Sequence, residues 1–305
     1  MSPAIEIRGL HKSYGANHVL QGISLTVPRG SVFALLGPNG AGKTTTINIL
    51  STLVPPDAGQ VRVAGHDVVR EPRAIHRLIS LTGQFAAVDD LLTGRENLHM
   101  MARLSQLPRS AAARRAGELL AQFDLSDAAD RLVRTYSGGM RRRLDIATSL
   151  LAQPQVLFLD EPTTGLDPRS RQGVWTMVRR LTDEGVTVVL TTQHLEEADT
   201  LADHIAVLHG GHIVAEGSPA TLKRLVGAEV VEVTYAGGRH DAVPTDGTIG
   251  DIRRVLAELD EAGDVERVGI REPSLDDVFL QLTSTPPAAD TPAAVTSLTA
   301  EEARS

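Results

Sequence analysis

The run Gly37-Pro38-Asn39-Gly40-Ala41-Gly42-Lys43-Thr44-Thr45 contains two glycines five positions apart, the second followed directly by Lys and Thr. The short apolar segment 31–36 precedes this run, and segment 46–50 can continue it as a helix. A strand, a glycine-rich loop and a helix in this order make a P-loop, in which successive N–H groups at the positive end of the helix face phosphate oxygens. We therefore expect Lys43 to reach the β- and γ-phosphates of a nucleotide, and the Thr44 hydroxyl to hold Mg²⁺.

Lysine is scarce in this chain, which makes an accidental match to the P-loop frame improbable. It occurs only as Lys12, Lys43 and Lys223, so a chance match somewhere in the chain has odds on the order of a few in a thousand. A P-loop alone leaves kinases, GTPases and ATPases open as functions.

Composition limits the class of protein. The length of 305 residues suits one large domain or two smaller ones. The apolar content of 42% is ordinary for a globular protein. The formal net charge of −8 gives no electrostatic case for a nucleic-acid partner. The chain has no cysteine, which excludes disulfides and thiolate metal sites. No basic-then-apolar leader and no apolar run of about 20 residues is present, so we expect a soluble chain that reaches a membrane only through a partner.

Tyr14 and Gln84 are weaker candidates for residues of the nucleotide site. Residues 4–30 alternate as β-strands do, and Tyr14 lies between the two alternating runs, where its ring could stack on a nucleotide base. Gln84 follows the strand-like segment 79–82 and could reach a metal or a water. By position alone, a core or rim tyrosine and a solvated loop glutamine are the commoner explanations.

Residues 94–152 are rich in Ala, Leu and Arg, and we interpret them as a helical insert. Near its end, Ser137 is a good helix N-cap, and two glycines follow it. A helix start of this kind is either an anion site or an ordinary capped helix. The three arginines that follow, 141–143, are expected to form a solvated face.

The apolar segment 156–159 predicts a strand buried on both faces, and it ends in Asp160-Glu161. Placing two adjacent carboxylates at the end of a buried strand costs free energy unless other groups pair with their charge, which favours a functional role. Because side chains alternate along a strand, we expect Asp160 to face Mg²⁺ and Glu161 to face a water. Asp167 is expected to cap a helix over 169–181. His194 follows the next buried strand, 186–191; a lone histidine is more often structural, but ligands bind at strand ends in such sheets.

These segments, in this order, resemble the nucleotide-binding subunit of ABC transporters. The matches cover roughly residues 4–220 and are, in chain order, Tyr14 (adenine stacking), 37–45 (Walker A), Gln84 (Q-loop), Ser137-Gly138-Gly139 (signature), 156–162 (Walker B), Gly165-Leu166-Asp167 (D-loop) and His194 (switch histidine). Several elements in the right order are far more specific than any one of them. The resemblance implies an α/β P-loop NTPase core with a mixed sheet, an antiparallel β subdomain and a helical insert.

A closer resemblance is to the daunorubicin-resistance type of antibiotic-export ATPase. It is carried by the segment 83–89, by the Tyr-Ser-Gly-Gly-Met form of the signature, and by the segment 272–280. Tyr136 and Met140 depart from the commoner Leu and Gln of the wider family, and Met140 cannot offer the hydrogen bonds of that Gln. The resemblance implies an ATP-hydrolysing subunit that powers efflux of a drug such as daunorubicin or doxorubicin.

The resemblance also implies a role for each site residue. Phosphate binding falls to Gly37, Asn39, Gly40, Gly42, Lys43 and Thr45; Mg²⁺ to Thr44, Gln84 and Asp160; the attacking water to Glu161; and the γ-phosphate to His194. One P-loop leaves the γ-phosphate open on one side, and the family closes it with a head-to-tail dimer, in which Ser137 and Gly139 of one copy cover ATP held by the other. Gln84 and the helical insert are expected to dock a separate integral membrane permease, at the cytoplasmic face of the cell membrane.

We expect three parts in the chain: an ATPase core over 4–220 with its helical subdomain at about 94–152, a small α/β accessory domain over 221–285, and a disordered tail over 286–305, where Pro, Ala, Thr and Ser dominate. The accessory domain could be a structural cap or could serve assembly or regulation.

Three other functions remain open. The first is an ABC ATPase for another cargo, such as a lipid or a polysaccharide, because ATPase motifs do not contact cargo. The second is an ABC protein of DNA repair or translation, which usually carries two ATP modules or a long coiled coil; this chain shows neither. The third is a small-molecule kinase, which would not need the signature.

Overall fold

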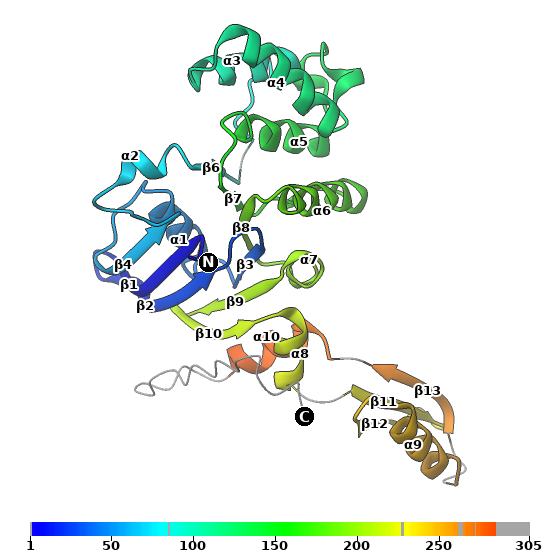
Figure 1. Ribbon diagram of the computed structural model, residues 1–305. Coiled ribbons are helices and arrows are strands. Elements are labelled where there is room, and N and C mark those ends of the chain that lie inside the picture. The colour runs from blue at the N-terminus through cyan, green and yellow to red at the C-terminus, as the bar shows by residue number, and fades with distance from the viewer. Residues whose placement is uncertain (1, 85, 227–228, 262–264, 272, 285–305) are drawn as a thin grey trace.

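The computed structural model describes residues 2–84, 86–226, 229–261, 265–271 and 273–284. The first elements form a four-stranded antiparallel sheet of order β2-β1-β4-β5 (Figure 1). Its strands are β1 (Ile5–Tyr14), β2 (Asn17–Val27), β4 (Ala58–Val63) and β5 (His66–Asp67). The predicted β-rich start of the chain is confirmed, but Tyr14 is the last residue of β1 and pairs with Asn17, rather than lying between the strands.

A second, six-stranded sheet of order β10-β9-β3-β8-β7-β6 forms the centre of the molecule. Its strands are β3 (Val32–Leu36), β6 (Ile79–Thr82), β7 (Val156–Asp160), β8 (Thr187–Thr192), β9 (His204–His209) and β10 (His212–Gly217). All neighbours pair in parallel except β9 and β10, which form the hairpin predicted around Gly210-Gly211. The carboxyl ends of β3 and β7, with β8 between them, therefore meet at one edge, where ligands bind in such sheets.

Alternating side chains of the central strands fill two different cores. In β3, Phe33 and Leu35 pack in the core shared with the antiparallel sheet, whereas Ala34 and Leu36 pack in the larger core on the opposite face. Both faces of this strand are buried, which is why its sequence is apolar throughout. The expected α/β class, with a mixed central sheet and a separate antiparallel sheet, is confirmed.

Helices lie on both sides of the central sheet, and three of them gather at one end of the molecule. Figure 1 shows α1 beside the antiparallel sheet, α6 and α7 on the other side, and α3, α4 and α5 gathered at one end. Their bounds are α1 (Lys43–Leu50), α2 (Pro72–Ile75), α3 (Gly94–Leu104), α4 (Arg109–Gln122), α5 (Gly138–Ser149), α6 (Pro168–Asp183) and α7 (Leu195–Leu201), with short 3₁₀ turns at Ser126–Ala128 and Val133–Thr135. A capping box of Thr93 and Glu96 starts α3.

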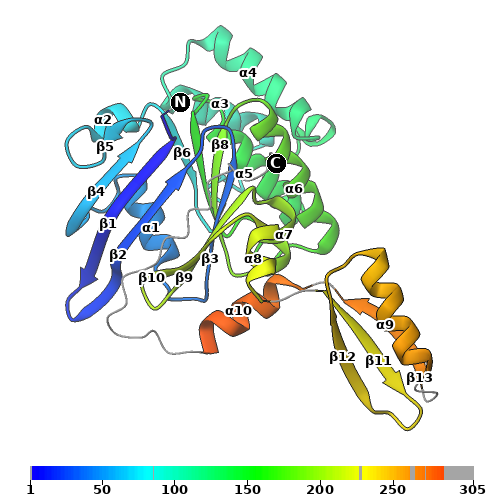
Figure 2. The same cartoon turned by 60° about the horizontal axis from the view of Figure 1, so that its bottom comes forward.

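The C-terminal part contains a third, three-stranded sheet with its own helix, and two further helices that pack against the rest of the chain (Figure 2). The sheet, of order β12-β11-β13, is covered by α9 around Val231, Val233 and Val255. By contrast, Leu222 of α8 and Leu275 of α10 belong to the large core of the main domain. The bounds are α8 (Pro219–Val226), β11 (Glu229–Tyr235), β12 (His240–Thr245), α9 (Ile249–Glu261), β13 (Val265–Arg271) and α10 (Leu275–Ser284).

The predicted disordered tail, 286–305, lies outside the described residues. Within the residues that the structure describes, no helix has both the length and the apolar content needed to cross a membrane.

Candidate active site

The P-loop is shaped by glycines that could not be replaced without moving the backbone. Gly42 has φ +110° and Gly40 has φ +81°, in the region that favours glycine. A β-carbon on Gly37 would lie 2.3 Å from the carbonyl oxygen of Leu208. Gly42 directly precedes α1, whose first residue is Lys43, and Asn39 and Gly40 are exposed. The loop is therefore a set of backbone N–H groups at a helix start, open on one side.

Lys43 is a buried cation whose ammonium group is only partly neutralised. Its Nζ donates to the carbonyl oxygens of Gly37 at 2.8 Å and Pro38 at 3.1 Å, and lies 3.7 Å from Oε1 of Glu161. Burial lowers the pKa of Lys43, and the nearby carboxylates of Glu161 and Asp160 partly oppose that shift. A cation held this way gains from the negative charge of a bound phosphate.

Thr44 and Asp160 meet although 116 positions separate them in the chain. The Thr44 hydroxyl donates to Oδ2 of Asp160 at 3.0 Å, and the Thr191 hydroxyl donates to Oδ1. A hydroxyl beside a carboxylate is a ligand set typical of Mg²⁺, which completes its shell with waters and phosphate oxygens. In the described residues no cluster of three His, Asp or Glu side chains offers a self-sufficient metal cage.

Glu161 directly follows β7 and has a left-handed backbone, with φ +47°. Such a conformation costs a non-glycine residue energy and is concentrated at functional sites. Its Oε2 accepts from the Gln84 amide and from the Thr164 hydroxyl, both at 3.2 Å. Asp160 and Glu161 do point to different partners, as expected, but the physical reason differs: β7 ends at Asp160, and the backbone turns at Glu161. Gln84, expected at Mg²⁺ with Thr44 and Asp160, donates its amide hydrogen bond to Glu161.

Ser137 and Gly139 lie at the start of α5. The Ser137 hydroxyl accepts from the Met140 N–H at 3.2 Å and is exposed, which confirms its N-cap role. A β-carbon on Gly139 would lie 2.4 Å from Oγ of Ser170, so this glycine allows α5 to approach α6 closely. In the described part of the chain, no hydrogen bond joins Ser137 or Gly139 to the P-loop. Helices α1 and α5 pack in the cores on opposite faces of the central sheet.

The two unusual residues of the signature have structural partners within the helical insert and the core. The Tyr136 ring is buried, and its hydroxyl donates to the Ala128 carbonyl oxygen at 2.6 Å. Burial raises the pKa of this hydroxyl. Met140 packs against the large core. Tyr136 therefore fixes the segment before the signature by a hydrogen bond that leucine could not make.

Tyr14 and His194 lie at the edges of this arrangement. Tyr14 is 49% exposed, and Nζ of Lys12 lies 5.5 Å from its ring centroid. On the same hairpin, the Val19 carbonyl oxygen would lie 3.1 Å from a β-carbon on Gly42, so β2 passes beside the P-loop. His194 is half-buried, and its backbone caps α7 just beyond the end of β8. Asp167 accepts from the Ser170 N–H at 2.9 Å, which confirms that it caps α6.

Arg142 was expected on a solvated face, and that expectation is wrong. The residue is 5% exposed, and it donates to the backbone oxygens of Gly83 at 2.7 Å and Pro162 at 2.9 Å. It also pairs with Asp145 at 3.2 Å. Burial lowers the pKa of Arg142 and raises the pKa of Asp145, and the attraction between the two opposes both shifts. An acid three positions after an arginine on a helix was the only local signal for this pair.

Glu197 is a second buried residue that sequence reasoning missed. It is fully buried in α7, three positions after His194. Its Oε1 accepts from the Thr163 hydroxyl at 2.8 Å and from Nε1 of Trp175 at 3.2 Å. Glu197 therefore joins the helix that follows His194 to the segment that follows Glu161.

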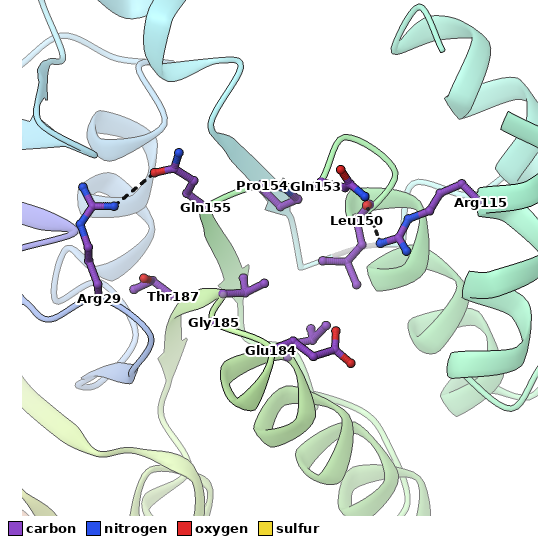
Figure 3. Close-up of a pocket in the computed structure, with 11 residues that line it drawn as sticks. Arg29, Arg115, Leu150, Gln153, Pro154, Gln155, Glu184, Gly185 and Thr187 are labelled. Carbon is purple, nitrogen blue, oxygen red and sulfur yellow. Dashed lines mark hydrogen bonds between the residues drawn. The ribbon is translucent and has the colours of Figure 1, made fainter. Parts of the chain in front are cut away.

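A partly open cavity lies away from these residues. Its volume is about 450 Å³, and it is lined at the amino ends of β7 and β8 by Gln155 and Thr187 (Figure 3). Arg29 donates to Gln155 at 3.2 Å, and Arg115 donates to the Leu150 carbonyl oxygen at 3.4 Å. Since the P-loop lies at the carboxyl ends of the strands, this cavity is at the opposite edge of the sheet.

Known proteins are similar to this chain over most of its length. The ABC transporter family matches residues 20–164. The chain is 50% identical to daunorubicin resistance ATP-binding protein DrrA2 of Streptomyces coeruleorubidus, over 92% of this chain and 95% of the relative. It is 46% identical to doxorubicin resistance ATP-binding protein DrrA of Mycobacterium tuberculosis, over 93% and 94%. It is 38% identical to Nod factor export ATP-binding protein I of Rhizobium sp., over 92% and 97%.

A solved ATP-binding subunit of an ABC transporter has the same fold. It superposes with a TM-score of 0.66 at 26% identity, covering 92% of this chain and 99% of that one. The chain therefore belongs to the ABC transporter ATPases, among the daunorubicin-resistance ATP-binding proteins.

Proposed function

We propose that this chain binds ATP with Mg²⁺ at Lys43, Thr44 and Asp160 and hydrolyses it to power export of a drug or antibiotic. The single observation that carries the site assignment is the convergence of the Lys43 ammonium, the Thr44–Asp160 pair and the Glu161 carboxylate at one edge of the sheet. Bound Mg²⁺ would neutralise charge on the phosphates. The Gln84 and Thr164 hydrogen bonds hold Glu161 where a water can be oriented.

The remaining residues take the roles that the family resemblance implies. Tyr14 stacks on adenine, and the backbone of residues 37–45 holds the phosphates. His194, at the carboxyl end of β8, contacts the γ-phosphate. Because the signature of a chain and its own P-loop belong to helices on opposite faces of the central sheet, Ser137 and Gly139 serve ATP held by a second copy. Each head-to-tail dimer then encloses two nucleotides, and hydrolysis removes the ligand that favours the closed pair.

The membrane-spanning part of the exporter is a separate permease, and the chain works at the cytoplasmic face of the membrane. The helical insert and the Gln84 segment are the surfaces that dock it. For the parts of this chain we propose an ATPase core that includes α8 and α10, since Leu222 and Leu275 pack in the large core, and an accessory unit over 229–271.

An anthracycline-type drug is the proposed cargo, and the names of the relatives that are 46–50% identical support it. The test is to co-purify the chain with its membrane permease, reconstitute the complex in vesicles, and measure ATPase activity with and without daunorubicin. We expect several-fold stimulation and drug uptake into inside-out vesicles, both lost in Glu161→Gln. A complex that hydrolyses ATP but neither responds to nor moves any anthracycline would refute this cargo.

A second cargo class is supported by the 38% identity to a Nod factor export protein. The same vesicles discriminate between the two, because a lipid or polysaccharide cargo would stimulate hydrolysis where daunorubicin does not.

A further inference from the structure

Arg142 sits on the signature helix α5 but makes its hydrogen bonds to residues of the chain's own hydrolytic site. Its Nε donates to Pro162 O at 2.9 Å and its Nη2 to Asp160 O at 3.3 Å, so it holds the backbone on both sides of Glu161. Its Nη1 donates to Gly83 O at 2.7 Å, directly before Gln84. One guanidinium therefore fixes the backbone beside both side chains that would handle the attacking water.

Asp145, one helical turn further along α5, completes this arrangement. It is 3% exposed, and its Oδ1 accepts from the Ala87 N–H at 2.9 Å, while Oδ2 faces Arg142. The segment that carries Gln84 is thus tied to α5 at two points, Gly83 and Ala87. Because Arg142 and Asp145 are three positions apart, both project from the same face of the helix.

We propose that Arg142 and Asp145 are positioning residues that couple the signature helix to Glu161 and Gln84 of the same chain. The inference rests on the proposed dimer, in which the start of α5 faces ATP held by the partner. ATP bound there would hold α5 in one position. Through their hydrogen bonds, Arg142 and Asp145 would then hold the backbone around the chain's own Glu161 in a matching position. Each site would then hydrolyse at full rate only when the opposite site is filled.

The geometry of the guanidinium explains why lysine could not replace it. Arginine presents five N–H donors in a planar fork, and this residue uses Nε, Nη1 and Nη2 toward three backbone segments. A single ammonium nitrogen cannot occupy all three positions. Arg142→Lys keeps the buried positive charge opposite Asp145 but loses this span, so it separates positioning from charge.

The test compares Arg142→Lys with wild type in the full-length chain. We expect kcat for ATP hydrolysis to fall about 10- to 100-fold, as when supporting hydrogen bonds are removed from a site. The affinity for a fluorescent ATP analogue should stay within about threefold, because no P-loop contact involves Arg142. With ATP and Mg²⁺, the variant should also accumulate dimer on size-exclusion chromatography, since slower hydrolysis leaves the closed pair intact.

Two further variants control the experiment. Arg143→Lys changes the neighbouring arginine, which contacts Phe123 O at 3.2 Å in the helical insert, and should keep kcat within about twofold. Asp145→Asn retains an acceptor for Ala87 but removes the charge opposite Arg142, and should lower kcat as Arg142→Lys does. Melting temperatures of all variants identify any loss of fold.

Two results overturn the inference. One is wild-type kcat in Arg142→Lys; the other is loss of the ATP-dependent dimer together with turnover, because Arg142 would then merely support the signature. In either case the wild-type chain still hydrolyses ATP, and the proposed function stands. A wild-type chain that hydrolyses no ATP would instead refute the proposed function, and this inference with it.

Discussion

Replacing Gly37 with alanine should displace the P-loop by a distance that the structure defines. The added β-carbon would lie 2.3 Å from the carbonyl oxygen of Leu208, where ordinary contact begins near 3.4 Å. Leu208 cannot yield easily, because it lies within β9 and pairs with Ile213 of β10. The P-loop must therefore shift by about 1 Å, and a misplacement of that size costs on the order of 100-fold in rate.

The measurement is kcat/KM for ATP hydrolysis from phosphate release, together with the affinity for a fluorescent ATP analogue. Gly117→Ala is the matched control, because Gly117 is exposed on α4 and its added β-carbon would meet nothing within 4 Å. The control should keep full activity and raise the free energy of unfolding by about 0.5–1 kcal/mol. Gly37→Ala with wild-type kcat/KM and wild-type affinity would refute the steric argument.

Three further substitutions test other parts of the site. Glu161→Gln should lower turnover by about 100-fold or more, because an amide cannot take up the proton of water, and should leave an ATP-trapped dimer on size-exclusion chromatography; undiminished steady-state hydrolysis would contradict this role. Lys43→Ala should weaken ATP binding by about 10- to 100-fold, as expected when a charge-assisted hydrogen bond is lost; unchanged affinity in titration would argue against the P-loop assignment. Tyr136→Phe removes the hydroxyl that donates to Ala128 and should lower the free energy of unfolding by about 1 kcal/mol in urea denaturation, with ATP affinity unchanged; no loss of stability would mean that this hydroxyl contributes little.

The features that could be predicted from sequence are those whose chemistry is local. The P-loop needs its glycines, Lys43 and Thr44 at fixed spacing, so the sequence motif by itself predicts the structure of the loop. The acids Asp160 and Glu161 are visible because the apolar run of a strand buried on both faces stops at Asp160, the last residue of β7. The N-cap roles of Ser137 and Asp167 likewise depend on residues within three positions.

The features that were missed depend on contacts between distant segments. Arg142 looked like part of a solvated run because its partners, Gly83, Asp160 and Pro162, lie 18 to 59 positions away. The left-handed backbone of Glu161 has no signal in residue type, since glutamate has no preference for that region. Strand β12 contains Pro244, which weakens a strand pattern; proline is tolerated there because β12 is an edge strand.

The return of α10 to the main domain determines how the accessory unit should be removed in experiments. Truncating the chain after α8 would delete Leu275 and Val278, and would uncover apolar surface on the ATPase itself. Loss of activity in such a truncation would report damage to the core rather than a task of the small sheet. Excising 229–271 and bridging the gap with a flexible linker would keep both helices on the core, and would let the contribution of the sheet be measured alone.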